Sequence, residues 1–160
     1  MKLKNMLSTF IVFVLAMGVF SQSAFAMTGV GDTKENAISL FPEMISSGWG
    51  VGQQDVNMYI DSASDQDWFK WTNITGKDLV LRAAIQPKDE NSYLRIGMII
   101  QYPSGKQTSI FYADPSNGPE KAKTLDGFQL PPGATVYISI DASTFGTPSQ
   151  YWFLFRLFQF

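Results

Sequence analysis

The chain has 160 residues, a formal net charge of −2, and neither cysteine nor histidine. These two absences exclude disulfides, Ser-His-Asp and Cys-His nucleophile systems, and zinc sites built from His or Cys ligands. The mildly acidic charge, without a basic stripe, argues against nucleic acid as a partner. Oxygen atoms remain as the available metal ligands, and these suit calcium.

The N-terminus has the features of a secretory signal peptide. Lys2 and Lys4 precede an apolar block, and an Ala-Phe-Ala sequence ends at Ala26. Because the apolar block is shorter than the roughly 20 residues of a membrane-spanning helix, we favour cleavage after Ala26 over an uncleaved anchor. We therefore predict a signal peptide over 1–26 and one domain over 27–160, in a secreted, extracellular protein with no membrane span after cleavage.

The first part of the predicted domain is a turn. Asp32 and Glu35 have the spacing of a capping box, which favours a short helical turn that delivers Ala37 and Ile38 to the core. A metal-ligand role for the two acids is the alternative.

The rest of the domain alternates between apolar and polar residues, with clusters of Gly, Pro, Asn and Asp between the alternating segments. No helical period of useful length interrupts this pattern. Strands are predicted over 54–60, 68–71, 79–85, 93–102, 107–113, 125–130, 135–141 and 150–160. The pattern predicts an all-β fold, an antiparallel β-sandwich or jelly-roll of about eight strands.

The stretch 65–71 combines acidic residues in a turn with aromatic residues in a strand. Asp65 and Asp67 close a polar turn, and the chain then alternates, so that Phe69 and Trp71 are predicted to face the core and Trp68 the opposite side. The two aspartates could accept backbone N–H groups as ordinary turn residues, or they could hold a cation.

The last predicted strand, 150–160, is apolar at both parities. This is typical of a central strand covered on both faces, and it could also provide a surface for a partner chain.

Five segments, taken in order, resemble the bacterial pre-peptidase C-terminal domain family, whose members include the collagen-binding domains of clostridial collagenases. These segments are Gly31-Asp32-Thr33-Lys34-Glu35-Asn36-Ala37, Asp65-Gln66-Asp67-Trp68-Phe69-Lys70-Trp71, Leu94 to Ile100 with Tyr102-Pro103-Ser104-Gly105-Lys106, Pro131-Pro132-Gly133 with Val136 to Ile140, and Tyr151-Trp152-Phe153-Leu154-Phe155. The resemblance implies a β-sandwich that, in most members, is attached to a secreted peptidase and assists secretion, substrate binding or localisation.

Some members of this family bind calcium through their opening segment and their Asp-x-Asp loop. The resemblance therefore implies a calcium site, and the positions that match it are Asp32, Glu35, Asn36, Asp65 and Asp67.

Aromatic residues at outward parity are the candidates for ligand contact. They are Trp49, Trp68, Tyr93, Phe111, Tyr112 and Tyr137. Single rings of this kind usually pack at the core or the sheet edge, whereas a cluster on one face would suit an extended polymer.

We therefore predict a secreted, non-catalytic binding or accessory module for an extracellular protein or polysaccharide, with calcium as a structural ion. The main alternative is a partner, chaperone or inhibitor of a separately encoded secreted enzyme. A weaker alternative is a hydrolase in which Asp65 and Asp67 form a carboxylate pair.

Overall fold

The computed structural model describes residues 31–42, 50–115 and 118–159. The predicted signal peptide and Trp49 lie outside these residues. The described part of the chain contains nine strands and no helix, so it also contains no helix that could cross a membrane. This confirms the all-β prediction.

Each of the eight predicted strand segments contains a strand in the structure. The strands are β1 (Ile38–Ser39), β2 (Gly50–Ile60), β3 (Gln66–Thr72), β4 (Leu79–Pro87), β5 (Tyr93–Gln101), β6 (Phe111–Tyr112), β7 (Lys123–Leu130), β8 (Thr135–Thr144) and β9 (Ser149–Gln159). The additional strand is β1, and the segment predicted over 107–113 contributes only the two residues of β6.

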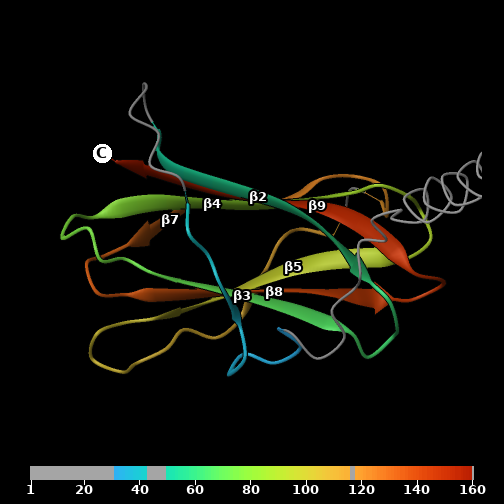
Figure 1. The fold of residues 1–160 in the computed structure, drawn as a ribbon, viewed down its shortest axis with the longest axis horizontal. Helices are drawn as coiled ribbons and strands as arrows, with labels where there is room; N and C mark the ends of the chain where they lie inside the picture. The colour runs from blue at the N-terminus through green and yellow to red at the C-terminus, as the bar shows by residue number, and fades with distance from the viewer. Residues whose placement is uncertain (1–30, 43–49, 116–117, 160) are drawn as a thin grey trace, which may run out of the picture.

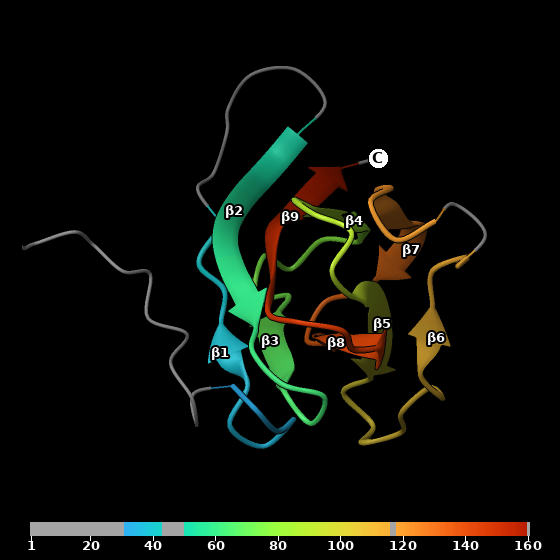
Figure 2. The same ribbon diagram turned by 90° about the vertical axis from the view of Figure 1, so that its right-hand side faces the viewer.

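Two sheets pack face to face as a sandwich (Figures 1 and 2). The five-stranded sheet has the order β1-β3-β8-β5-β6, and the four-stranded sheet has the order β2-β9-β4-β7. The neighbouring strands run antiparallel except for β1 and β3, which pair in parallel over two residues. The antiparallel sandwich is confirmed, with this short parallel edge as the exception.

Alternating residues from both sheets fill the core between them. Phe69 from β3 is 1% exposed and stacks on Phe153 from β9, with 4.6 Å between the ring centroids. Trp71 lies 5.9 Å from Phe155 in the same core. The predicted inward direction of Phe69 and Trp71 is confirmed, and such aromatic pairs add about 1 kcal/mol each beyond the burial of their apolar area.

Strand β9 is central in its sheet, where it pairs with β2 on one side and β4 on the other. Its inward residues are buried, and the outward residues Trp152, Leu154 and Phe158 are half-buried. The central position predicted for this strand is confirmed. Its outer parity forms part of the outer face of the four-stranded sheet.

Residues 31–37 form a turn rather than the predicted helical turn. The hydroxyl of Thr33 accepts a hydrogen bond from the Asn36 N–H at 3.3 Å, and the Gly31 carbonyl accepts one from the Trp68 N–H at 2.6 Å. Gly31 has a φ of 84°, and a Cβ at this position would lie 3.0 Å from the Ile38 side chain. Glycine therefore allows the turn to approach β3 closely.

Candidate functional site

The turn between β2 and β3 is closed by Asp65, as the turn-residue interpretation predicts. Its carboxylate accepts a hydrogen bond from the Asp61 N–H at 2.7 Å, and its own N–H donates to the Ser62 carbonyl at 3.2 Å. Burial raises the pKa of Asp65 above its usual value, and the nearby carboxylates of Asp32 and Asp61 add to this rise. The turn chemistry of Asp65 is therefore observed within an acidic environment.

Asp67 lies two residues further along the chain and points into the sandwich. It is 4% exposed, and its carboxylate accepts a hydrogen bond from the Tyr151 hydroxyl of the other sheet at 2.5 Å. Burial raises the pKa of Asp67 to about 7; the bond from Tyr151 lowers it, and repulsion from Asp65, Asp32 and Asp61 raises it further. Asp67 is thus a buried, partly compensated acid that titrates near neutral pH.

The structure brings together three of the five predicted calcium ligands and adds one acid. Asp32, Asp65 and Asp67 interact electrostatically, and Asp61 joins them. Glu35 and Asn36 are exposed on the 31–37 turn. Across residues 31–42, 50–115 and 118–159, no group of three or more acidic side chains is arranged closely enough to hold a metal ion.

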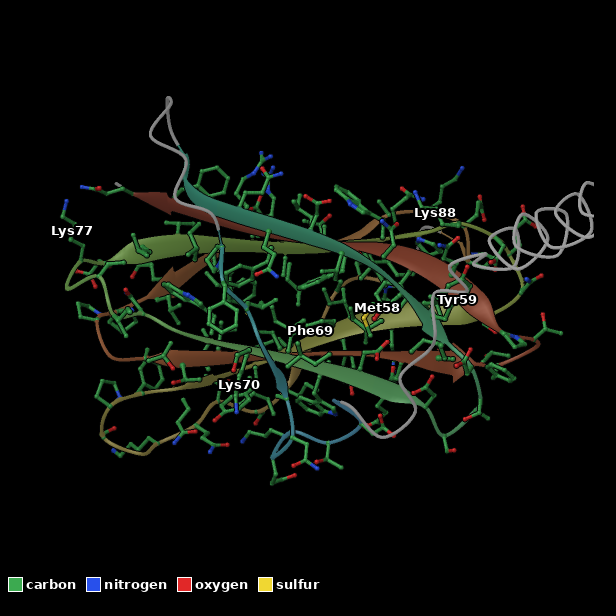
Figure 3. All side chains as sticks on the ribbon, viewed as in Figure 1. Met58, Tyr59, Phe69, Lys70, Lys77 and Lys88 are labelled. Carbon is green, nitrogen blue, oxygen red and sulfur yellow. The ribbon has the colours of Figure 1, made fainter. Side chains whose placement is uncertain are left out.

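The outer face of the five-stranded sheet carries a second group of candidates. Figure 3 shows Phe69 between the sheets and Lys70 on the outer side of β3. Trp68 has the same outward parity as Lys70, and the register pairs Lys70 with Tyr137 of β8. Two predicted ligand-contact residues, Trp68 and Tyr137, therefore lie on one face.

One row of this face crosses four strands. Trp68 pairs with Ser139, Ser139 with Gly97, and Gly97 with Tyr112. Because neighbouring strands are about 4.8 Å apart, the α-carbons of Trp68 and Tyr112 are separated by about 14 Å. Two small residues thus form a floor between a tryptophan and a tyrosine.

The floor between these rings is tightly packed and contains an unpaired polar atom. A Cβ at Gly97 would lie 2.8 Å from Ile110 Cδ1 and 2.9 Å from both Tyr112 Cε1 and Ser139 Oγ. Ser139 is 3% exposed, and its hydroxyl has no hydrogen-bond partner within the described structure. Since an unpaired buried hydroxyl costs about 1–3 kcal/mol, this group is an energetic exception on an otherwise satisfied face.

Cations lie against two of the rings. The Arg95 guanidinium is 4.5 Å from the centroid of Tyr112 and forms two hydrogen bonds to Asp141, at 2.5 and 2.9 Å. Lys34 Nζ is 4.6 Å from the centroid of Tyr137 and donates to Gln107 Oε1 at 2.6 Å. Lys34 and Arg95 are therefore engaged within the protein, and the rings keep part of their surface free.

The bond between Lys34 and Gln107 joins two connections on the outer side of the five-stranded sheet. These are the 31–37 turn and the segment between β5 and β6, which both lie on that side in Figures 1 and 2. Trp68 is held by a separate bond, from its Nε1 to Gln66 Oε1 at 3.1 Å.

The remaining aromatic candidates lie elsewhere. Phe111 is 40% exposed and tilts against Phe128 of β7, with 5.6 Å between the ring centroids. Tyr93 lies 4.8 Å from the ammonium of Lys123, also on β7. The five predicted residues that the structure describes therefore do not form one cluster. Trp68, Tyr112 and Tyr137 share the outer face, whereas Tyr93 and Phe111 contact β7.

No family model matches the sequence, and a search of curated proteins finds no match. The structure is similar to the pre-peptidase C-terminal domain of collagenase from Bacillus anthracis, with 10% identity and a TM-score of 0.47, over 74% of this chain and 93% of that chain. This is the family that the sequence resembles. Weaker similarities include infectious bursal disease virus, Gx strain, with 15% identity and a TM-score of 0.33 over 77% of this chain and 37% of that chain. Desmodium yellow mottle tymovirus has 10% identity and a TM-score of 0.29, over 75% and 93% of the two chains. Likeness at this level concerns the fold and says nothing about ligands.

Sequence reasoning missed several residues of the two sites. Asp61 could have been found, because it lies in the same acidic turn as Asp65. The contact of Arg95 with Tyr112 and the floor made by Ser139 and Gly97 depend on the strand order, which no local signal in the sequence gives.

Proposed function

We propose that this protein is a secreted, non-catalytic binding module that attaches to an extracellular protein or polysaccharide through the outer face of the five-stranded sheet. The observation that carries the proposal is the position of Trp68, Tyr112 and Tyr137 on one face, around the Ser139–Gly97 floor. The partly exposed rings, rather than the buried floor between them, would contact an extended ligand, because each ring offers a large apolar surface with little conformational freedom to lose.

The residue types of the sequence and the placement of two aspartates support a non-catalytic role. The sequence has no histidine or cysteine. The carboxylate pair considered for hydrolysis is divided, because Asp67 is buried against Tyr151 while Asp65 closes a turn. A glycosidase pair needs both carboxyl groups to face one substrate. This arrangement favours binding over hydrolysis.

The experiment is a pull-down with insoluble collagen, peptidoglycan and insoluble glycans. We expect at least one matrix to retain the wild-type protein, and Trp68→Ala and Tyr112→Ala to lower that retention. Equal retention of the wild type and both variants would remove the assignment to this face. Retention on no matrix, together with co-purification of a secreted enzyme from culture medium, would favour the partner or inhibitor alternative.

We also propose calcium as a structural ion at the acidic end of the sandwich. The mutual repulsion of Asp32, Asp61, Asp65 and Asp67 supports this, since a divalent cation would relieve it. Binding would require these side chains to move closer together, with carbonyls or water completing the six to eight oxygen ligands that calcium takes.

A further inference from the structure

The outer face of the four-stranded sheet contains two arginines in direct cross-strand register. Arg82 of β4 pairs with Arg156 of β9, and both strands are central in the sheet. The row is completed by Gln53 of β2, opposite Arg156, and by Asp126 of β7, opposite Arg82. Each of the four strands thus contributes one polar residue, with the backbones of the two arginines adjacent in the middle.

The partners of these arginines compensate one of the two positive charges. Arg82 forms an ion pair with Asp126, whereas Arg156 donates from two of its nitrogens to the neutral amide oxygen of Gln53. The row therefore holds two positive charges and one negative charge. Arg156 has no acidic partner in the row, so one positive charge of the row is not neutralised within it.

The arginines also retain unused hydrogen-bonding capacity. The Nε atom of Arg82 is buried and has no partner within the described residues. A guanidinium offers five N–H donors in a planar fork that matches the oxygens of phosphate, sulfate or carboxylate groups. The buried Nε is out of reach of a ligand, so the terminal amino groups of the two arginines would bind such a group with the donors that Asp126 and Gln53 do not use.

Apolar side chains surround the two guanidinium groups. Both arginines approach the ring of Phe158, at 5.8 and 6.0 Å from its centroid. Half-buried Val80 pairs with Phe158 in the row on one side, and half-buried Leu154 pairs with Ala84 in the row on the other. These neighbours place apolar surface beside the guanidinium groups, while the Arg82 side chain stays 41% exposed and open to a ligand from solvent.

We propose that Arg82 and Arg156 form a binding site for an oxyanion of the phosphate or sulfate class. The anion would bridge the two guanidinium groups and neutralise the excess positive charge of the row. The site lies on the opposite sheet from the proposed aromatic binding face, so it is independent of that function.

The test measures binding of inorganic phosphate and of inorganic sulfate by calorimetry and by thermal shift, with NaCl at matched ionic strength as the reference. We expect either oxyanion to raise the Tm of the wild type above this reference. Arg156→Gln and Arg82→Gln should each weaken the apparent affinity at least 10-fold. The matched control is Lys106→Gln, which removes one positive charge from an exposed position between β5 and β6 of the other sheet and should bind as the wild type does.

Equal Tm values in phosphate, sulfate and NaCl would overturn the proposal, as would equal affinity of the wild type and both row variants. Stability measured without oxyanion shows whether a variant is folded, so that a loss of binding can be distinguished from a failure to fold. At low ionic strength, Arg156→Gln should be about as stable as the wild type, because Arg156 has no acidic partner in the row to lose. A large loss of stability would contradict the uncompensated positive charge on which the site rests.

A second experiment compares the binding of glucose 6-phosphate with that of glucose 6-sulfate, to distinguish a phosphate ester from a sulfate ester as the natural ligand. The tighter of the two identifies whether the natural ligand carries phosphate or sulfate esters. Failure of both to bind would overturn the proposal for ligand-borne oxyanions. Because the polymer pull-down depends on Trp68 and Tyr112, its failure leaves this result unaffected.

Discussion

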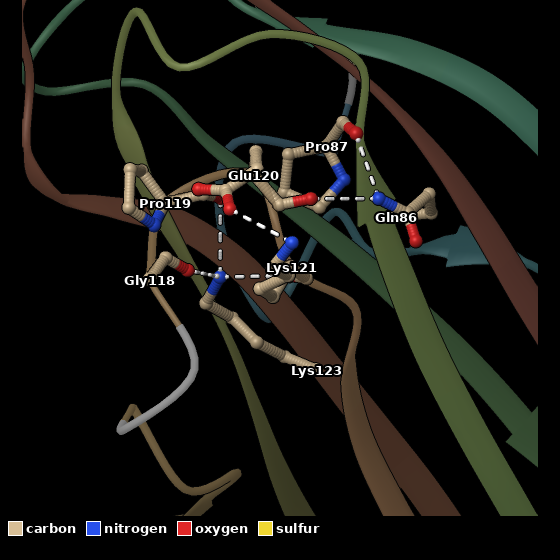
Figure 4. Close-up of polar contacts among 7 residues, drawn as sticks. All are labelled: Gln86, Pro87, Gly118, Pro119, Glu120, Lys121 and Lys123. Atoms are coloured by element: carbon tan, nitrogen blue, oxygen red, sulfur yellow. Dashed lines mark hydrogen bonds and ion pairs between the residues drawn. The ribbon is translucent and has the colours of Figure 1, made fainter.

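Lys123 and Asp67 are both buried, at 2% and 4% exposure, yet their surroundings differ. The ammonium of Lys123 donates to the carbonyls of Gly118, Pro119 and Lys121 at 2.9, 3.3 and 3.0 Å (Figure 4), and it also lies over the Tyr93 ring. Burial lowers the pKa of Lys123, and the Glu120 carboxylate opposes that effect.

Asp67, by contrast, has one hydrogen bond from Tyr151 and is surrounded by acids. A buried charge is tolerated where fixed dipoles or opposite charges replace its lost hydration, and it is costly where they do not. The carbonyls around Lys123 therefore compensate its buried charge. The charge of Asp67 lacks such compensation, so we expect the Asp67 end of the sandwich to respond to protons and cations.

The largest expected effect is on the pH dependence of stability. In the folded protein the pKa of Asp67 is about 7, whereas in the unfolded chain it returns to its ordinary value of 3.8. The free energy of unfolding contributed by this group should therefore fall as pH rises from about 4 to about 7, by up to about 4 kcal/mol. Chemical denaturation of the wild type and Asp67→Asn across this range measures it, and parallel curves for the two proteins would contradict the account.

Removing the ammonium of Lys123 should lower the free energy of unfolding by nearly as much as the change expected for Asp67. Lys123→Met keeps most of the side-chain volume but leaves three carbonyls without their donor, which we expect to lower the free energy of unfolding by about 3 kcal/mol. Lys121→Met is the matched control, because Lys121 is exposed and pairs with Glu120 at the surface; it should change stability by less than about 0.5 kcal/mol. A similar small change in both variants would show that the carbonyl cage is not important for stability.

Calcium should act on the Asp67 end alone. If calcium binds there, a free concentration about ten times the Kd raises the free energy of unfolding by roughly 1.4 kcal/mol. Thermal melts with calcium, with magnesium and with chelator test this in the wild type, Asp32→Asn and Asp67→Asn. The calcium effect should be smaller in both variants, and a wild-type melting curve unchanged by chelator removes the calcium site.

The smallest effect concerns the unpaired hydroxyl on the outer face. Ser139→Ala removes a buried polar atom that has no partner, so we expect the free energy of unfolding to rise by about 1 kcal/mol. Ser92→Ala is the control, because the Ser92 hydroxyl donates to the Thr147 carbonyl at 2.8 Å and its removal should destabilise the protein. Destabilisation of equal size in both variants would mean that Ser139 does have a partner.

Alternation in the sequence was sufficient to predict much of the fold. It placed Phe69 and Trp71 in the core, and the same parity implies that Asp67 is buried, although Asp67 was interpreted as a turn residue and metal ligand. Strand β1 could not be predicted, because its two residues depend on a parallel pairing with β3 that the tight turn at Gly31 makes possible.

The candidate sites were less predictable than the fold, because a site depends on which strands are neighbours. Parity identified Trp68 and Tyr137 as outward residues, but their gathering with Tyr112 follows from the order β3-β8-β5-β6. The strand order also places Phe111 away from these three residues. It pairs with the inward residue Met98, and its ring contacts Phe128 of β7. The arginine pair arises in the same way, from the adjacency of β4 and β9.

We propose that the outer face of the five-stranded sheet binds the extracellular protein or polysaccharide. The most direct test is a set of depletion isotherms on the matrix that retains the wild-type protein, comparing Trp68→Ala with Trp152→Ala. Trp152 is the matched control, because it is a half-buried tryptophan on the outer face of the other sheet, with its Nε1 bonded to Asp55 at 3.2 Å. The account predicts at least 10-fold weaker binding for Trp68→Ala and wild-type binding for Trp152→Ala. Equal affinities in all three proteins, or a loss confined to Trp152→Ala, would contradict it.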